Sequence, residues 1–163
     1  GKAVHFNESQ VRPMGRTAAG VRGVTLDSDS DKVVGMVCIT RDDANLLVVS
    51  ENGYGKRSLI DDYRITNRGG KGVKTINITD KTGRLVAIKQ VVDDDELMII
   101  NRSGITIRIE VKELRIMGRA TQGVRLIKLN DDDRISSVEK IQKIDGENLN
   151  PTGENLNPTE QQQ

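Results

Sequence analysis

A repeat of about 51 residues runs through this chain, and it constrains the possible folds more than any other feature. Without internal gaps, residues 11–22 align with residues 63–74 and with residues 114–125, at offsets of 52 and 51 residues. The columns kept in all three copies are Arg12, Arg64 and Arg115; Arg16, Arg68 and Arg119; and Gly20, Gly72 and Gly123. A further basic column holds Arg22, Lys74 and Arg125. Self-similarity at this period indicates a repeat architecture, in which each unit needs its neighbours.

The apolar pattern inside each repeat is typical of β-strands. Ile105, Ile107, Ile109 and Val111 alternate with polar residues, which is the period of a half-buried strand. Further apolar or β-branched runs occupy Leu46–Ser50, Leu97–Asn101, Leu85–Ile88 and Val33–Met36. Short turns such as 51–53 and 102–104 separate them, and no stretch shows a helical period. We therefore expect about four strands per repeat.

Four-stranded units at this spacing predict an all-β fold, a propeller-like array of blades. Three blades are too few to close a ring, which usually has about 4–8. Because Gly1 aligns with Gly53 and Gly104, the first copy starts at its second strand, and we expect the C-terminal part of a larger, here partial, array. The expected units are a partial blade at 1–45, blades at 46–96 and 97–142, and a disordered polar tail at 143–163. The tail carries a tandem Gly-Glu-Asn-Leu-Asn-Pro-Thr repeat.

The net charge of +1 conceals an uneven distribution. Residues 1–26, 53–78 and 104–129 carry +3, +4 and +4, whereas residues 27–52, 79–103 and 130–163 carry −4, −1 and −5. Blades arranged around an axis would place the basic loops as a belt on one rim. Such a belt suits the phosphates of a bent duplex, because each neutralised phosphate releases a counterion. With only three aromatic residues, binding of single strands by base stacking is disfavoured.

The basic loops supply the candidate binding residues. Those expected to contact phosphates of double-stranded DNA are Arg12, Arg16, Arg22, Arg64, Arg68, Lys71, Lys74, Arg115, Arg119 and Arg125. The loop glycines, expected to permit tight turns and close approach of backbone N–H groups to an anion, are Gly15, Gly20, Gly69, Gly70, Gly72, Gly118 and Gly123. The Gly-Lys pair of the second loop is not followed by Ser or Thr, so a nucleotide-binding P-loop is not indicated.

The remaining reactive residues favour structural roles. Cys38 lies in the apolar run 33–39 and is expected to be buried, and one histidine, His5, leaves no His/Cys metal cluster. Tyr54 and Tyr63 are expected to be structural. The acidic runs 93–96 and 131–133 are expected to be solvated turns and not a cation site. No apolar run approaches the ~20 residues that span a membrane, and a single cysteine fits a reducing cytoplasm.

The motifs at 12–23, 63–73 and 117–124 resemble the C-terminal β-pinwheel domain of the bacterial DNA gyrase A protein. The resemblance covers about residues 1–142 and implies the last three of six blades, whose basic rim wraps duplex DNA. It also implies a cytoplasmic, ATP-dependent type II topoisomerase holoenzyme that includes the other gyrase A blades, the N-terminal region and the gyrase B protein. ATP and magnesium act elsewhere in that holoenzyme, so no cofactor is expected here. The related protein of topoisomerase IV carries similar blades.

Two features of that family bear on this chain. Its defining box, Gln-Arg-Arg-Gly-Gly-Arg/Lys-Gly, belongs to the first blade, and residues 67–72 only approximate it. Its strand-cleaving tyrosine lies in an N-terminal region that this chain lacks, so no catalytic residue is expected. The alternative is a propeller-like scaffold for protein–protein interaction. Such a scaffold would expose an apolar or aromatic patch, which the scarcity of aromatic residues disfavours.

Overall fold

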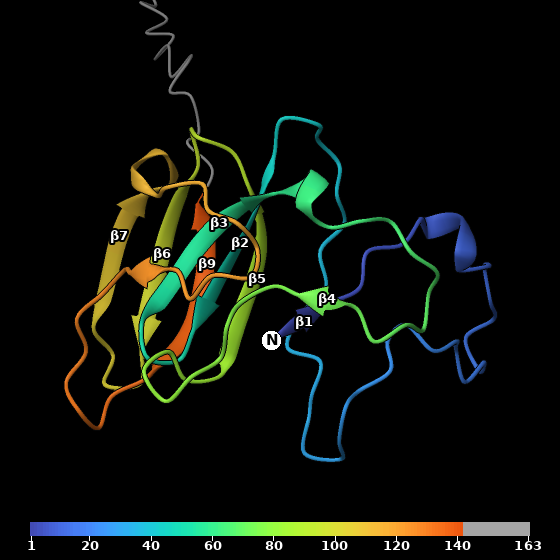
Figure 1. Cartoon of the computed structure of the whole chain (residues 1–163), viewed down its shortest axis with the longest axis horizontal. Coiled ribbons are helices and arrows are strands. Elements are labelled where there is room, and N and C mark those ends of the chain that lie inside the picture. Colours follow the sequence, from blue (N-terminus) through green and yellow to red (C-terminus); the bar gives the residue numbers. More distant parts are fainter. Residues whose placement is uncertain (142–163) are drawn as a thin grey trace, which may run out of the picture.

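A computed structural model describes residues 1–141, which form nine β-strands and three short 3₁₀ turns (Figure 1). The strands are β1 (Lys2–Ala3), β2 (Asn45–Ser50), β3 (Tyr54–Leu59), β4 (Val73–Lys74), β5 (Leu85–Val91), β6 (Glu96–Asn101), β7 (Thr106–Glu110), β8 (Val124–Arg125) and β9 (Ile135–Ile141). The all-β prediction is confirmed. Within this part of the chain no helix is long and apolar enough to cross a lipid bilayer.

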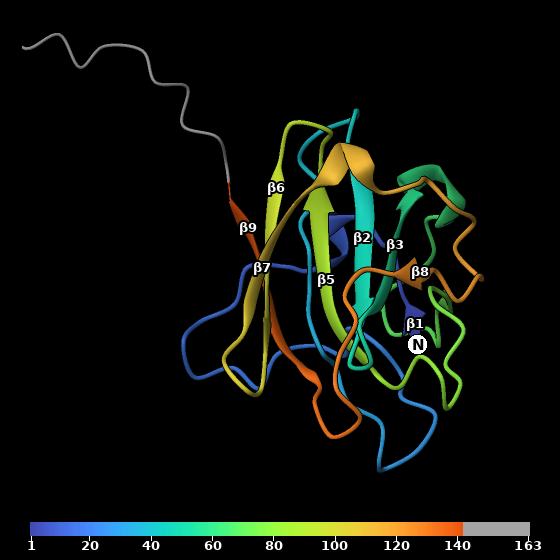
Figure 2. The same cartoon turned by 90° about the vertical axis from the view of Figure 1, so that its left-hand side faces the viewer.

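The strands form three antiparallel sheets, with the orders β5-β2-β3-β8, β7-β6-β9 and β1-β4. Figures 1 and 2 show the two larger sheets side by side, with the first repeat as extended loops beside them. The second and third repeats contribute four strands each, as their apolar patterns predict. The turn between β6 and β7 ends at Gly104, whose φ of 86° suits glycine.

The sheets do not coincide with the sequence repeats, because each repeat gives one strand to the repeat before it. The third repeat's β8 pairs with β3 of the second repeat, with Tyr54 opposite Arg125. The second repeat's β4 pairs with β1 of the first repeat, with Lys2 opposite Lys74. These two pairings have the same register once the offsets of 52 and 51 residues are applied. We call β4 and β8 the donated strands.

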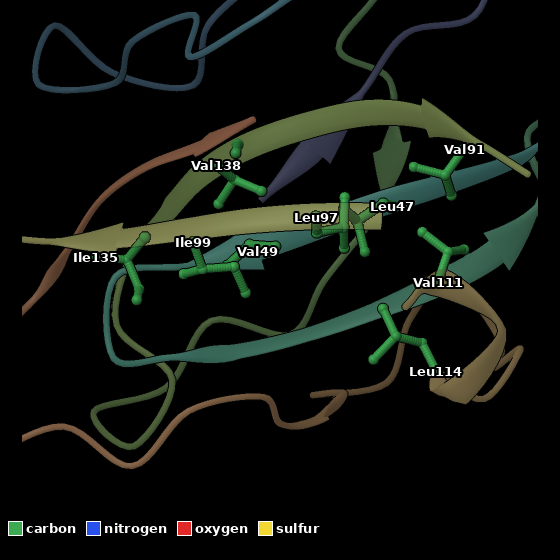
Figure 3. Close-up of a cluster of buried hydrophobic side chains, with 10 residues drawn as sticks. Leu47, Val49, Val91, Leu97, Ile99, Val111, Leu114, Ile135 and Val138 are labelled. Atoms are coloured by element: carbon green, nitrogen blue, oxygen red, sulfur yellow. The ribbon is translucent and has the colours of Figure 1, made fainter. Parts of the chain in front are cut away.

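The core lies between the two larger sheets (Figure 3). Leu47 and Val49 of β2 face Leu97 and Ile99 of β6, and all four side chains are fully buried. Two hydrophobic faces therefore remove each other from water, which neither sheet could do alone. Leu126, Ile127 and Leu129, which follow the donated strand β8, pack against the same core. The donated strand is thus anchored by burial as well as by pairing.

The first repeat departs from the prediction, since residues 1–44 contain only the short strand β1. The strand expected at Val33–Met36 is absent, and Cys38 is exposed, so both predictions are wrong. In the second repeat the matching strand, β5, pairs with β2. Segment 33–39 has no such strand partner among the described residues. It lies against β5 instead, where the Thr40 amide donates to Gln90 Oε1 at 2.8 Å.

A single 3₁₀ turn precedes the basic loop of every repeat, at Glu8–Gln10, Ile60–Asp62 and Val111–Glu113. The three turns have the same offsets as the sequence repeat, although the sequence pattern did not indicate them. The blade boundaries at 45/46 and 96/97 stay a prediction. The predicted disordered tail at 143–163 lies outside the described residues.

Candidate nucleic-acid interface

Three loops, at residues 11–22, 63–74 and 114–125, carry the basic residues singled out in the sequence. Each loop leaves a 3₁₀ turn, and the second and third end in the donated strands β4 and β8. The second loop lies against the first repeat, where the Thr66 amide donates to the His5 carbonyl at 2.8 Å. The third lies against the second repeat in the same way, with the Met117 amide bonded to the Arg57 carbonyl at 2.8 Å. The fold therefore places these two loops in equivalent settings.

Two of the basic columns are fully on the surface. They consist of Arg12, Arg64 and Arg115, and of Arg22, Lys74 and Arg125, all of them exposed, as is Lys71. In the second column Lys74 and Arg125 belong to the donated strands, so a paired backbone fixes their positions. Cations held on a rigid backbone and open to solvent are suited to contacts with phosphate oxygens.

The column of Arg16, Arg68 and Arg119 has a different setting. Arg16 is exposed, whereas Arg68 and Arg119 are half-buried between consecutive repeats. Arg68 Nη1 donates to the Arg22 carbonyl at 2.6 Å, and Arg119 Nη1 donates to the Lys74 carbonyl at 2.9 Å. Both acceptors belong to the exposed column of Arg22, Lys74 and Arg125. The structure therefore gives Arg68 and Arg119, two of the three members of this predicted phosphate-binding column, a contact within the protein itself.

The glycine column also serves the contact between repeats. Gly72 and Gly123 have φ values of 76° and 80°, in the left-handed region that favours glycine. A Cβ on Gly123 would lie 2.5 Å from the Gly55 carbonyl oxygen, and one on Gly72 would overlap the Ala3 carbonyl. Gly20 has the same φ class but no atom within 4 Å of such a Cβ. Of the remaining loop glycines, Gly69 has a positive φ, and Gly15, Gly70 and Gly118 do not.

Two buried basic side chains on β3, which sequence analysis did not single out, support the third loop. Lys56 is fully buried, and its Nζ donates to the Gly118 carbonyl at 2.6 Å and to Thr121 Oγ1 at 3.1 Å. Desolvation lowers the pKa of Lys56 to about 8. Arg57 donates from Nε to the Leu114 carbonyl at 2.7 Å. Both residues lie in a strand that is inside a sheet. A charged side chain buried there requires a hydrogen-bond partner, and this requirement could have singled them out.

The counterpart of Arg57 in the first repeat is His5, at the offset of 52 residues. His5 Nδ1 lies 2.7 Å from the Tyr63 carbonyl, which is the counterpart of the Leu114 carbonyl. The expectation that His5 is structural fits this contact. Tyr63 is also structural, because its buried hydroxyl lies 2.6 Å from Thr75 Oγ1. Burial raises the pKa of Tyr63 above its usual range.

Tyr54 contributes to a cationic surface at the β3–β8 junction. Its hydroxyl accepts from Arg125 Nη2 at 2.9 Å, and Arg125 and Lys81 lie 5.5 and 5.4 Å from its ring centroid. An open pocket of about 320 Å³ lies beside this cluster, and Lys128 and Arg134 also line it. The cation–π contact with the ring and the hydrogen bond to the hydroxyl hold the Arg125 guanidinium in place. The junction therefore presents positive charge at a defined position.

The acidic runs are less solvated than predicted. Asp95, Glu96 and Asp133 are each less than a tenth exposed, so the prediction of solvated turns is wrong for these three. Asp133 accepts from Asn101 Nδ2 at 2.5 Å and from Ser103 Oγ at 2.8 Å, which satisfies its buried carboxylate. Asp93, by contrast, is exposed and pairs with the buried Arg57. Among residues 1–141 no group of three or more acidic, His or Cys side chains is arranged to hold a metal ion.

Comparison with known proteins gives a consistent result. A family model described as the DNA gyrase C-terminal domain, beta-propeller, matches residues 1–40, 44–91 and 95–142. The DNA gyrase A protein of Staphylococcus aureus is 48% identical over 141 residues, which are 86% of this chain and 16% of that protein. This chain thus spans about a sixth of the length of such relatives.

Two solved structures share the architecture. A DNA gyrase A C-terminal domain superposes with a TM-score of 0.78 at 30% identity, over 86% of this chain and 47% of that one. The C-terminal domain of a DNA topoisomerase IV superposes with a TM-score of 0.81 at 25% identity, over 87% of this chain and 44% of that one. The β-pinwheel or propeller-like prediction is therefore confirmed.

Proposed function

The chain belongs to the DNA gyrase C-terminal domain family, and on that premise we propose that it binds and wraps duplex DNA without sequence preference. The proposed contacts are made by the two exposed basic columns and by Lys71. The protein would act as the accessory domain of an ATP-dependent type II topoisomerase. The 48% identity with a gyrase A protein favours gyrase over topoisomerase IV as the parent enzyme.

The observation that carries this proposal is the repetition of exposed cations at equivalent positions of successive loops. Arg64 and Arg115 lie on loops docked identically on the preceding repeat, as do Lys74 and Arg125 on the donated strands. A fixed spacing between equivalent cations suits a regular polyanion, and duplex DNA is one. Contacts to phosphates position a protein on DNA but do not distinguish bases, so binding without sequence preference follows.

In the proposed setting, the remaining activities of the enzyme come from parts outside this chain. The partners would be the other gyrase A blades, the N-terminal region of gyrase A and the gyrase B protein, in the bacterial cytoplasm. ATP hydrolysis and its magnesium ion would belong to that holoenzyme. This chain would supply the curved basic surface on which a DNA segment bends.

The test is a salt titration of the chain with a duplex of mixed sequence. We expect log affinity to fall linearly with log salt concentration, with a slope of about −0.9 for each phosphate neutralised. Charge reversal of Arg12, Arg64 and Arg115 to Glu should weaken binding of unrelated duplexes equally and make the slope shallower. Reversal of Lys32, Arg84 and Arg102 is the matched control, since these exposed residues lie outside the three loops. Absence of binding at low salt, or equal losses in the two triple variants, would refute the proposal.

A further inference from the structure

Arg68 and Arg119 occupy equivalent positions between consecutive repeats. Each guanidinium reaches back to the preceding repeat and donates to one backbone carbonyl, of Arg22 at 2.6 Å and of Lys74 at 2.9 Å. The donor–acceptor separations along the chain are 46 and 45 residues, so the same contact is made twice. Because the contact recurs at equivalent positions of two successive repeats, it is a feature of the repeat and not of one loop.

The acceptors connect this contact to the proposed interface. Arg22 and Lys74 are members of the exposed basic column, and the bond is to their own carbonyl groups. Lys74 is held from the other side as well, because β4 pairs with β1 and places Lys74 opposite Lys2. A residue fixed by the repeat before it and by the repeat after it has a defined Cα position. Its side chain consequently starts from a fixed point on the surface.

Arginine is well suited to this role. Its planar guanidinium has five N–H donors in a rigid fork, and an arginine side chain keeps its charge in proteins. A charged donor also makes a stronger bond to a carbonyl than a neutral donor does. Arg68 shows the use of several donors, since its Nε also donates to the Gln10 carbonyl at 3.2 Å.

We propose that Arg68 and Arg119 are positioning residues for DNA binding: they hold the backbone of Arg22 and Lys74, and those two residues contact phosphate. This inference rests on the proposed function and divides its basic columns into two kinds. The columns that begin at Arg12 and at Arg22 bind phosphate. The column that begins at Arg16 lies between them in sequence, and its members Arg68 and Arg119 orient residues of the Arg22 column. Arg16, the first-repeat member of that column, is exposed.

The test is a double-mutant cycle on DNA affinity with the full chain. Lys74→Ala removes the cation but leaves the carbonyl that Arg119 binds. At 0.1 M salt each phosphate contact contributes roughly tenfold in affinity, so Lys74→Ala should weaken binding by about that factor. Arg119→Ala should weaken binding by a similar factor alone and cause no further loss in the Lys74→Ala background. The pair Arg68→Ala and Arg22→Ala should behave in the same way.

Arg115→Ala is the matched control, because Arg115 lies on the same loop and is exposed. Its loss should add fully to that of Lys74→Ala. A second measurement without DNA follows hydrogen exchange of the Asn77 amide, which donates to the Thr121 carbonyl of the third loop at 3.1 Å. That exchange should be faster in Arg119→Ala and unchanged in Arg115→Ala.

The outcomes separate this role from the proposed function. Additive losses for Arg119→Ala and Lys74→Ala would show that Arg119 is itself a phosphate ligand, and would overturn the positioning role. An unchanged DNA affinity in Arg119→Ala would show that the hydrogen bond to the Lys74 carbonyl has a purely structural role. Unchanged exchange of the Asn77 amide would show that this hydrogen bond does not hold the two repeats together. Either result also overturns the positioning role. If the unaltered chain does not bind DNA at all, the proposed function fails first, and the positioning role fails with it.

Discussion

Replacing Gly123 by alanine tests how tightly a donated strand is seated on the preceding repeat. Two costs arise from the local geometry. With φ at 80°, an alanine incurs about 1–2 kcal/mol of backbone strain. Its Cβ would also lie 2.5 Å from the Gly55 carbonyl oxygen, whereas ordinary carbon–oxygen contacts start at about 3.3 Å. Gly55 is the residue opposite Val124 in the β3–β8 pairing, so relief of the overlap separates these strands.

The loss of one or two backbone hydrogen bonds at about 1 kcal/mol each raises the total to about 3 kcal/mol. Gly20→Ala is the matched control, with a φ of 85° and no atom within 4 Å of the new Cβ, so only the strain of about 1–2 kcal/mol applies. Urea unfolding followed by circular dichroism gives both free energies of unfolding. Equal destabilisation by the two substitutions would refute the view that close approach between repeats dictates glycine at this column.

Three further predictions concern the two buried basic side chains of β3 and the cysteine. Because the pKa of Lys56 is about 8 in the folded chain and near 10.5 when unfolded, the unfolded chain binds more protons between these values. The free energy of unfolding should therefore rise from pH 8 to pH 10.5, by on the order of 2 kcal/mol, and Lys56→Met should abolish that rise in pH-dependent urea titrations. Arg57→Ala leaves the Leu114 carbonyl without its donor and should cost about 2–3 kcal/mol in the same assay, against less than about 0.5 kcal/mol for the exposed Arg64→Ala. Cys38 is exposed, so a thiol reagent should modify it in the folded chain nearly as fast as in urea, and strong protection would contradict its placement.

The sequence predicted the strands of the second and third repeats because apolar or β-branched runs recur there at matching positions. Six of these eight strands also find a partner within their own repeat, namely β2, β3 and β5 in one and β6, β7 and β9 in the other. The same reasoning failed at Val33–Met36, since a strand forms only when a partner strand is present, and the described residues offer this segment none. Propensity and pattern describe a segment, whereas pairing depends on a neighbour.

The pairing of the donated strands with the preceding repeat could not be predicted for a related reason. Each has two residues, too few to show a period, and its partner lies about 70 residues away. The basic columns were visible in the sequence, but the difference between them was not. Arg115 and Arg119 stand four residues apart on one loop and look alike in sequence, yet only Arg119 reaches the carbonyl of the preceding repeat.

The donated strands have a consequence for the integrity of the chain. Consecutive repeats are joined once by the peptide chain and a second time by a strand that one repeat lends to the other. A protease cut in the exposed turn at Asp93–Asp94, between β5 and β6, would sever only the first connection. The second and third repeats would stay together through β8 on β3 and through their shared core, and would separate only in denaturant. A domain linked in this way does not depend on any single covalent linker to keep its repeats together.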